Sequence, residues 1–296
     1  MSYFQCFIVF HLSAAIWLTT HFVIFSGLYL LVSQQWCRLF LLGLMLVILG
    51  YCRFPKSQRA IDFFMPAFRE GFGGVTIIRN DLNSISKPRL YAIHPHAILA
   101  NGLGMAMHDC VSRGERITVV ASSVLYWLNP IFRLFVNSMG CGISSVVKRD
   151  LERVMRSGDS IAIVPGGFEE VMLMEDGRDV VYLKRRIGFI RVCERFKYDI
   201  VPVLVFGESL LYRNRIPLTH FLARISAKLK MALVLPVGKC WWNFMPADLP
   251  KGMLVVFGQP ISSGGDCNIL HHKYMENLKE MHRRYNPYPS SKLKLI

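Results

Sequence analysis

The chain has 296 residues, of which 52% are hydrophobic, and its formal net charge is +15. Residues 1–37 contain no Asp, Glu, Lys or Arg, so the positive charge belongs entirely to the remainder of the chain. An uncharged apolar N-terminus beside a basic body favours a protein held against an anionic membrane surface. Nucleic-acid binding is disfavoured, because the cations are scattered and the sequence shows no nucleic-acid-binding motif.

The first predicted element is an apolar segment from Cys6 to Val32, which is long enough to cross a bilayer core of about 30 Å. A polar break follows, and then a second apolar run from Leu39 to Tyr51. This run is shorter than the roughly 20 residues of a straight span, so it either completes a hairpin or re-enters the membrane. A signal peptide is disfavoured, because the N-terminus has neither a basic leader nor a small-residue cleavage site.

Arg53, Lys56 and Arg59 follow the second apolar run at once. The positive-inside rule places these cations, and the rest of the chain with them, on the cytosolic side. A complete hairpin would leave both termini facing the cytosol. We therefore expect a membrane-anchoring hairpin at residues 1–59 and a cytosol-facing domain at residues 60–296.

From residue 60 onward, short apolar runs alternate with helical patterns such as 150–155 and 188–196. This alternation predicts an α/β fold with a mainly parallel sheet flanked by helices. The Pro- and Lys-rich tail at 286–296 is expected to be loosely ordered. The runs predicted as strands are 89–93, 117–121, 160–164, 199–205 and 253–257.

His94-Pro95-His96 directly follows the first of these predicted strands. Catalytic groups of open α/β sheets gather beyond the carboxyl ends of strands. A neutral imidazole there can take a proton from an alcohol that attacks a thioester. Two nearby histidines are also common in cores and on surfaces. A metal-dependent hydrolase is a further alternative, but no additional ligands stand at a suitable spacing.

Two glycines, Gly166 and Gly167, follow the predicted strand at 160–164. Glycines let the backbone approach a substrate closely and offer its N–H groups to negative charge. An ordinary strand-to-helix turn explains the spacing equally well. The adjacent Glu169 and Glu170 favour the start of a helix in either case.

A basic cluster, Lys184-Arg185-Arg186 with Arg191, opens the apolar helical pattern at 188–196. Such runs are usually solvated faces. The functional alternative is an anion site for the phosphates of coenzyme A, since Arg binds phosphate in bidentate geometry and helix N-termini attract anions.

The eight cysteines lie far apart and form no CxxC pair. This spacing predicts neither a disulfide framework nor a zinc site, and it is typical of a protein in a reducing cytosolic compartment. We expect these cysteines to act as small buried hydrophobic residues.

The order of these segments resembles the diacylglycerol/monoacylglycerol/wax-ester acyltransferase family, the second type of diacylglycerol acyltransferase. The resemblance runs from the N-terminal hydrophobic segments to about Tyr285. Each block is short, but five of them occur in the family's order. The blocks are His-Pro-His at 91–96, a Gly-rich segment ending in Arg149-Asp150, Gly-Gly-x-x-Glu at 165–170, Arg-x-Gly-Phe at 186–191, and a Val-Pro strand ending in Phe-Gly-Glu at 199–208.

This resemblance implies a glycerolipid-acyltransferase-like fold and a membrane-bound O-acyltransferase that uses acyl-CoA as co-substrate, with no metal and no other cofactor. The first expected acceptor is diacylglycerol, which would give triacylglycerol; monoacylglycerol and long-chain alcohols are further options. The expected location is the endoplasmic reticulum membrane with the catalytic domain facing the cytosol, or lipid droplets. The expected partners are the bilayer and, as a further option, a second copy of the chain.

The resemblance also implies roles for individual residues. The wider superfamily has an Asp five residues after its catalytic His; counting from His96 reaches Asn101, whereas counting from His94 reaches Leu99. We therefore expect His96 to be the base, with His94 in support and Asn101 as a neutral orienting group. Because an Asn replaces the Asp, we expect Glu170 or a backbone carbonyl to fix the His96 tautomer.

Backbone N–H groups of Gly166 and Gly167 are expected to stabilise the oxyanion. Arg186, together with Arg149 or Arg191, is expected to hold the phosphates of coenzyme A.

Ala97 departs from the family, which usually has glycine after the second histidine. A methyl group at this position is expected to narrow the acyl or alcohol channel. Together with Asn101, the departure leaves a catalytically inactive lipid-binding or lipid-droplet protein as an alternative.

Overall fold

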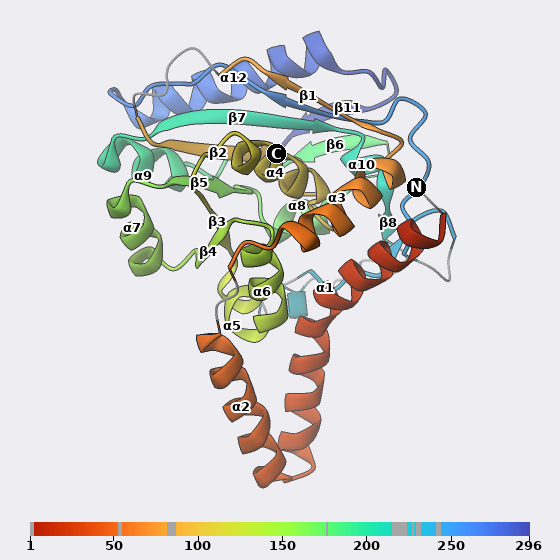
Figure 1. Ribbon diagram of the computed structural model, residues 1–296. Coiled ribbons are helices and arrows are strands. Elements are labelled where there is room, and N and C mark those ends of the chain that lie inside the picture. The colour runs from red at the N-terminus through yellow and green to blue at the C-terminus, as the bar shows by residue number, and fades with distance from the viewer. Residues whose placement is uncertain are drawn as a thin grey trace.

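The computed structural model describes residues 3–52, 55–81, 87–175, 177–214, 224–226, 228, 232–240 and 244–296. These residues form an α/β body from which two helices project (Figure 1).

The body is built on a seven-stranded sheet in the order β1-β10-β7-β2-β5-β3-β4. From β7 to β4 every neighbouring pair is parallel, whereas β10 runs antiparallel to β7 and carries β1 with it. The expectation of a mainly parallel sheet is therefore confirmed, with two reversed strands at one edge. The strands are β1 (Val75–Arg79), β2 (Arg89–His94), β3 (Ile117–Ala121), β4 (Gly142–Ser145), β5 (Ser160–Ile163), β7 (Asp199–Phe206) and β10 (Met253–Phe257).

The two central strands, β2 and β7, are buried at every position. Continuous burial requires near-continuous apolar sequence, which is why these strands read as apolar runs rather than as alternating patterns. Helices cover the sheet, among them α12, which lies along one side of β7 (Figure 1).

The helices of the body begin at side-chain caps in several places: Ser57, Ser122, Asn129 and Asp266 each accept a hydrogen bond from a backbone N–H of the following turn. Observed helices α7 and α9 confirm the helical patterns predicted at 150–155 and 188–196. The helices are α3 (Gln58–Gly71), α4 (Asn101–Ser112), α5 (Ser123–Leu128), α6 (Pro130–Ser138), α7 (Lys148–Ser157), α8 (Phe168–Met172), α9 (Gly188–Phe196), α10 (Glu208–Leu211) and α12 (Cys267–Tyr285).

Two short sheets complete the body: β6 (Arg178–Val181) with β11 (Lys292–Leu295), and β8 (Arg213–Asn214) with β9 (Pro236–Val237). The expectation of a loosely ordered tail at 286–296 is therefore wrong. The tail ends in a strand that pairs in parallel with β6, and Ile296 continues the pairing by accepting hydrogen bonds from Leu183 and Lys184. Leu293 and Leu295 alternate with lysines and pack against the core, a period of two that the basic composition obscured.

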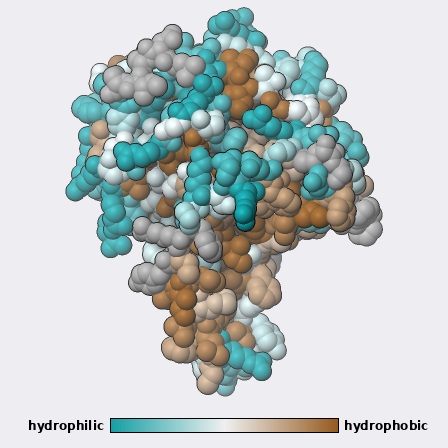
Figure 2. Space-filling view, in the orientation of Figure 1, coloured by the Kyte–Doolittle hydropathy of each residue, from teal (hydrophilic) through white to brown (hydrophobic). Residues whose placement is uncertain are grey.

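The N-terminal segments form two helices, α1 (Tyr3–Val32) and α2 (Trp36–Tyr51), joined by a short turn. Within the described part of the chain, α1 is the one helix that is long and apolar enough to cross a membrane, and the apolar part of α2 is shorter. The last turns of α1 and the whole of α2 project from the body side by side (Figure 1), and their surface is mainly hydrophobic (Figure 2).

The first part of α1 packs against the body. Phe10 makes edge-to-face contacts with Phe68 and Phe72. Asn129, which is 0% exposed, donates from Nδ2 to the Ile16 carbonyl at 2.7 Å and to Thr20 Oγ1 at 3.0 Å. The apolar N-terminal helix and the α/β body therefore share one hydrophobic core.

All eight cysteines are unpaired, and Cys6, Cys110, Cys141 and Cys193 are buried in the core. Cys37 and Cys52, near the two ends of α2, are exposed.

We predict that Asn129→Ala lowers the free energy of unfolding by about 3 kcal/mol, the sum of one helix cap and two buried hydrogen bonds. The substitution removes the helix cap on the Phe132 N–H as well as the buried bonds to α1, each worth about 1 kcal/mol. The matched control is Ser122→Ala, which removes only a cap of similar geometry at an exposed position. Thermal unfolding in detergent should show a clearly larger loss for Asn129→Ala, and equal losses would contradict the tether to α1.

Candidate active site

Five strands, β7, β2, β5, β3 and β4, run in one direction, so their carboxyl ends lie along a single edge of the sheet. Ligands of open α/β folds bind beyond such an edge. The chain delivers three predicted site segments there: His96 after β2, Gly166 after β5 and Arg149 after β4. Asn101, the first residue of α4, follows His96 by one short turn.

His94 is the last residue of β2 and its side chain is completely buried. Its Nε2 lies 2.9 Å from Oη of Tyr274 on α12, and its Nδ1 lies 3.4 Å from Oε1 of Glu170 without the alignment of a hydrogen bond. Burial raises the pKa of Tyr274 above its usual value, so the phenol keeps its proton at neutral pH. His94 is therefore enclosed within the protein and has no exposed face for a substrate.

His96 is only partly buried, in contrast to His94. Its Nδ1 lies 2.9 Å from the carbonyl oxygen of Ala97. A carbonyl can only accept, so this contact places the proton of the neutral ring on Nδ1 and leaves the Nε2 lone pair as the basic site. The backbone carbonyl, one of the two expected partners of His96, is thus the group that contacts its ring.

Glu170, the other expected partner, holds the backbone of His96 instead. The carboxylate is 1% exposed; Oε2 accepts from the His96 N–H at 2.6 Å and Oε1 accepts from the Tyr182 N–H at 3.1 Å. These bonds tie the segment after β2 to α8 and to the segment after β6. The orientation of the His96 ring therefore depends on Glu170 through the main chain.

Glycine is required at positions 166 and 167 for two different structural reasons. A Cβ on Gly166 would overlap the Glu170 carboxylate, so this position must be glycine for Glu170 to fold back. Gly167 has φ +58° and ψ −146°, a conformation that is essentially limited to glycine. The Gly167 N–H already donates to the Val164 carbonyl at 3.1 Å, whereas the Gly166 N–H has no partner among the described residues. Of the two predicted oxyanion donors, the Gly166 N–H is thus the one that the described fold does not use, and Gly166 itself is buried.

Ala97 is buried, and its φ of +43° lies in the left-handed region that favours glycine. The glycine of the similar family at this position suits this backbone conformation. The Ala97 methyl group therefore strains the main chain beside His96, since a Cβ is disfavoured in the left-handed region.

Asn101 contacts Glu208, a residue that the sequence analysis did not single out. Oε1 of Glu208 accepts from the backbone N–H and the Nδ2 of Asn101, at 2.9 Å and 3.1 Å, and Oε2 accepts from the Gly102 N–H at 2.6 Å. The carboxylate thus caps the N-terminus of α4. The contacts of Asn101 with Glu208 orient the start of α4, and none of the described contacts joins Asn101 to the ring of His96.

Two important residues were missed from the sequence. Glu208 ends the Phe-Gly-Glu block that resembles the family, and this was the signal that could have identified it. Tyr274 had no such signal, because it lies in the middle of α12, 180 residues beyond its partner His94.

Arg186 lies beside the Gly-Gly turn. It forms an ion pair with Glu169, and its guanidinium carbon lies 5.3 Å from the ring centroid of Tyr182. Arg149 is exposed on the first turn of α7, 3.5 Å from Asp150, and Arg191 is exposed on α9. The described contacts thus bring Arg186 next to the Glu169–Glu170 segment but do not gather the three arginines into one cluster.

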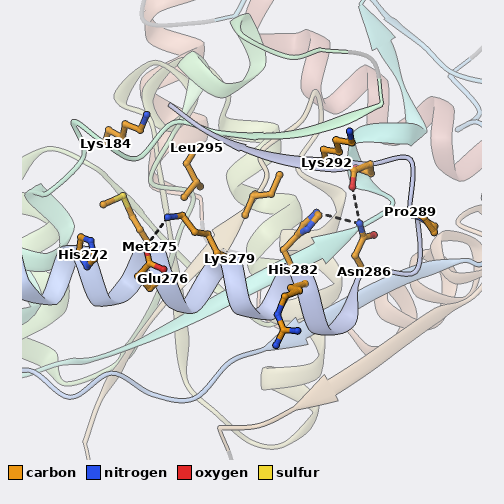
Figure 3. Close-up of a pocket in the computed structure, with 13 residues that line it drawn as sticks. Lys184, His272, Met275, Glu276, Lys279, His282, Asn286, Pro289, Lys292 and Leu295 are labelled. Atoms are coloured by element: carbon orange, nitrogen blue, oxygen red, sulfur yellow. Dashed lines mark hydrogen bonds and ion pairs between the residues drawn. The ribbon is translucent and has the colours of Figure 1, made fainter.

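A cleft of about 780 Å³ lies along the outer face of α12, between this helix and the tail strand β11 (Figure 3). Neither His96 nor Glu170 lines it. Lys279 is paired with Glu276 in the cleft, and Lys184 stands two residues before Arg186. The cleft is therefore a second basic surface near the site. Its basic and imidazole side chains are Lys184, His272, Lys279, His282, Arg283 and Lys292.

The two histidines of the His-Pro-His segment do not converge on a common point, since His94 contacts Tyr274 and His96 contacts Ala97. In the described ranges, no group of three or more His, Cys, Asp or Glu side chains is placed to hold a metal ion. This donor arrangement does not favour a metal-dependent hydrolase.

Comparison with known proteins identifies a family. The family model described as diacylglycerol acyltransferase matches residues 29–292. Diacylglycerol O-acyltransferase 2A of Umbelopsis ramanniana is 26% identical over 225 residues, 68% of this chain and 62% of the relative. Diacylglycerol O-acyltransferase 2 of Dictyostelium discoideum is 30% identical over 210 residues, 66% of this chain and 62% of the relative.

The human 2-acylglycerol O-acyltransferase 1 is 27% identical over 214 residues, 65% of this chain and 63% of the relative. The chain thus spans less than two thirds of the length of these relatives. Among solved structures, the 1-acyl-sn-glycerophosphate acyltransferase of Thermotoga maritima aligns with a TM-score of 0.46 and 11% identity, covering 95% of this chain and 96% of that one.

We predict that Glu208 makes stability depend on pH in a definite direction. Burial raises the pKa of Glu208 to about 7, against the lowering effect of its hydrogen bonds from Gly102 and Asn101. A glutamate in an unfolded chain has a pKa of about 4.3. Between these values the folded protein binds one more proton than the unfolded chain, so the contribution of Glu208 to stability falls as the pH rises.

The test compares melting temperatures of the wild type and Glu208→Gln across about pH 4.5 to pH 8, a range set by the two pKa values. Other titrating groups cancel in the difference. The wild type should gain stability relative to the variant on the acidic side, with little change in the difference above pH 7. Parallel pH profiles would contradict the raised pKa.

Proposed function

Because the chain belongs to the diacylglycerol acyltransferase family, we propose that it is a membrane-bound O-acyltransferase that moves a fatty acyl group from acyl-CoA to a lipid alcohol. The observation that carries this proposal is the geometry of His96. Its imidazole is partly exposed at the carboxyl edge of the sheet, with Nδ1 on the Ala97 carbonyl and Nε2 left as a base.

The proposed reaction is direct transfer without an acyl-enzyme. Nε2 of His96 takes the proton of the acceptor hydroxyl while the oxygen of this hydroxyl attacks the thioester carbonyl carbon. The Gly166 N–H stabilises the negative oxygen of the tetrahedral intermediate. The carbon–sulfur bond then breaks, and the departing sulfur takes the proton from His96, so that the products are an ester and free coenzyme A.

The surrounding residues act by positioning. Glu170 holds the His96 main chain, and the buried His94–Tyr274 pair supports the end of β2 behind it. Glu208 and Asn101 fix the start of α4 on the other side of the turn. A rigid turn matters, because general-base catalysis needs the imidazole within hydrogen-bond reach of the hydroxyl.

We propose diacylglycerol as the first acceptor, with triacylglycerol as the product. The similar proteins described above are named as acyltransferases of diacylglycerol and of 2-acylglycerol, which supports both as acceptor classes. Long-chain alcohols remain a further acceptor class in the family that the sequence resembles. All three acceptor classes carry a hydroxyl group on an apolar molecule. The acceptor therefore reaches the enzyme from the lipid bilayer and not from water.

The proposed location is the endoplasmic reticulum membrane, with lipid droplets as a second site. The apolar helix α1 and the exposed apolar side chains of α2 support an anchor formed by these two helices. The cations at Lys56 and Arg59 follow the anchor and support a cytosolic body.

We predict that His96→Ala lowers acyl transfer by about 10²- to 10⁴-fold, the usual contribution of a general base, without preventing membrane insertion. The control is His272→Ala, an exposed histidine of the α12 cleft, which should keep the normal rate at saturating acyl-CoA. Membranes that contain each variant are assayed with labelled acyl-CoA and a panel of acceptors, and the products are separated by lipid class.

Near-normal activity of folded His96→Ala would show that the assigned base is wrong. Failure of the wild type to form an ester with any acceptor would instead favour an inactive lipid-binding protein. Stoichiometric zinc or iron in the purified protein, required for activity, would favour a hydrolase.

A second prediction concerns the phosphates of coenzyme A. If Arg186 binds them, Arg186→Gln should raise the KM for acyl-CoA by about tenfold to a hundredfold, the value of one charge-assisted hydrogen bond. The double variant Lys184→Gln/Lys292→Gln in the α12 cleft should then leave this KM unchanged. The opposite pattern would place the phosphates in the cleft. Variants of Arg149 and Arg191 measure their proposed contributions in the same assay.

A further inference from the structure

Four exposed apolar side chains lie on neighbouring segments that follow β3 and β4. Trp127 on α5 is 54% exposed, Ile131 on α6 is 43% exposed, and Val146 and Val147 after β4 are 53% and 43% exposed. The segments are joined, since the Val146 N–H donates to the Ala121 carbonyl at 2.9 Å and Ser145 Oγ lies 3.5 Å from Ser123 Oγ. We name these four residues the foot.

The foot adjoins the two projecting helices. Both α5 and α6 contact α1 and α2, and Asn129 between them bonds directly to α1. Figure 1 shows α5 and α6 at the base of the projection, and Figure 2 shows the hydrophobic surface of the projection reaching the adjoining part of the body. The apolar surface of the proposed anchor therefore continues onto the catalytic body.

The length of α2 leaves a gap that the foot can fill. Its 16 residues rise about 24 Å, less than the bilayer core of about 30 Å. The turn between α1 and α2 carries Gln34 and Gln35, and Arg38 in the first turn of α2 donates to Gln35 Oε1 at 2.7 Å. An Arg at the bilayer centre costs about 2.5–3.5 kcal/mol on insertion scales, so this polar tip belongs at the far headgroup region. The tip reaches that depth only if the near end of the projection sinks by about 6 Å.

Cations border the foot. Lys148 and Arg149 follow Val147 and are exposed. Each such cation near an anionic lipid surface contributes about 1 kcal/mol. An apolar patch bordered by lysine and arginine matches a lipid interface, in which apolar groups sink about 5–10 Å and cations meet the headgroups.

We infer that the foot inserts into the near leaflet together with the α1–α2 anchor, as a second membrane contact of the catalytic body. The inference rests on the proposed membrane-bound function and deepens it. The foot follows β3 and β4 at the same edge of the sheet as His96, and β3 is two strands from β2, about 10 Å at ordinary strand spacing. Insertion therefore turns the edge that carries His96 toward the headgroups, where the hydroxyl of a neutral lipid resides.

The test uses a single environment-sensitive fluorophore on cysteine. Exposed or half-exposed Cys37, Cys52, Cys240 and Cys267 are first replaced by Ser in the full chain. Probes are then placed by Ile131→Cys in the foot, by Phe25→Cys in the anchor and by Ile269→Cys on α12, an exposed apolar control position. Each protein is reconstituted in phosphatidylcholine–phosphatidylserine vesicles with or without lipids that carry a quencher on the acyl chain.

The Ile131 and Phe25 probes should shift to the blue and be quenched, whereas the Ile269 probe should remain in water. Quenching at Phe25 without quenching at Ile131 would overturn the inference and leave the proposed anchor intact. Absence of quenching at Phe25 would overturn the anchor and the inference together. A blue shift at Ile131 that needs no vesicles and rises with protein concentration would assign the foot to a second copy of the chain, which also overturns the inference.

An activity readout separates positioning from folding. Trp127→Gln/Ile131→Gln should raise the KM for a long-chain acceptor in vesicles by roughly tenfold, because apolar contact with lipid is lost. The KM for a short-chain, water-soluble acceptor in detergent should stay unchanged, as should both values for Ile269→Gln. Equal effects on both acceptors would contradict a membrane contact.

Discussion

The carboxylate of Glu170 is buried between main-chain segments from different parts of the body, with one oxygen on the His96 N–H and the other on the Tyr182 N–H. Burying such a group costs free energy unless its oxygens find donors, and here backbone donors supply them. The absence of a side chain at Gly166 follows from the same contact. The position of the candidate base therefore depends on a carboxylate that need not touch the substrate.

A second buried carboxylate works in the same way on the next turn. Glu208 receives the first N–H groups of α4 and the side chain of Asn101, so the chain between His96 and α4 is held at both ends. Ala97 and Ala100 in this turn have left-handed backbone conformations, and the hydrogen bonds at the two ends of the turn stabilise them. Hydrogen bonds to Glu170 and Glu208 thus fix both ends of one short turn at the carboxyl edge of the parallel sheet, and this turn carries the candidate base.

The carboxyl edge of the sheet and the projecting helices together define how the molecule is oriented on the proposed membrane. The clamp from Asn129 to Ile16 and Thr20 fixes α1 against the body, so the projecting helices and the sheet edge keep one relative orientation. A lipid substrate gains from this arrangement, because it avoids the cost of carrying an apolar body through water.

Local sequence determined the elements: apolar runs marked β2, β5 and β7, and the His-Pro-His segment stood at a strand end. The order of the strands in the sheet decided which side chains meet around the two histidines. A hydrogen bond between segments that are distant in sequence leaves no periodic pattern in either segment, so the sequence did not predict these pairs. Glu170 meets His96 across 74 residues and Tyr274 meets His94 across 180. The same reason explains the tail, whose pairing with β6 turned a basic, Pro-containing segment into a strand. Sequence alone thus proposed His96 as the candidate base, whereas only the tertiary structure decided which groups hold that imidazole in place.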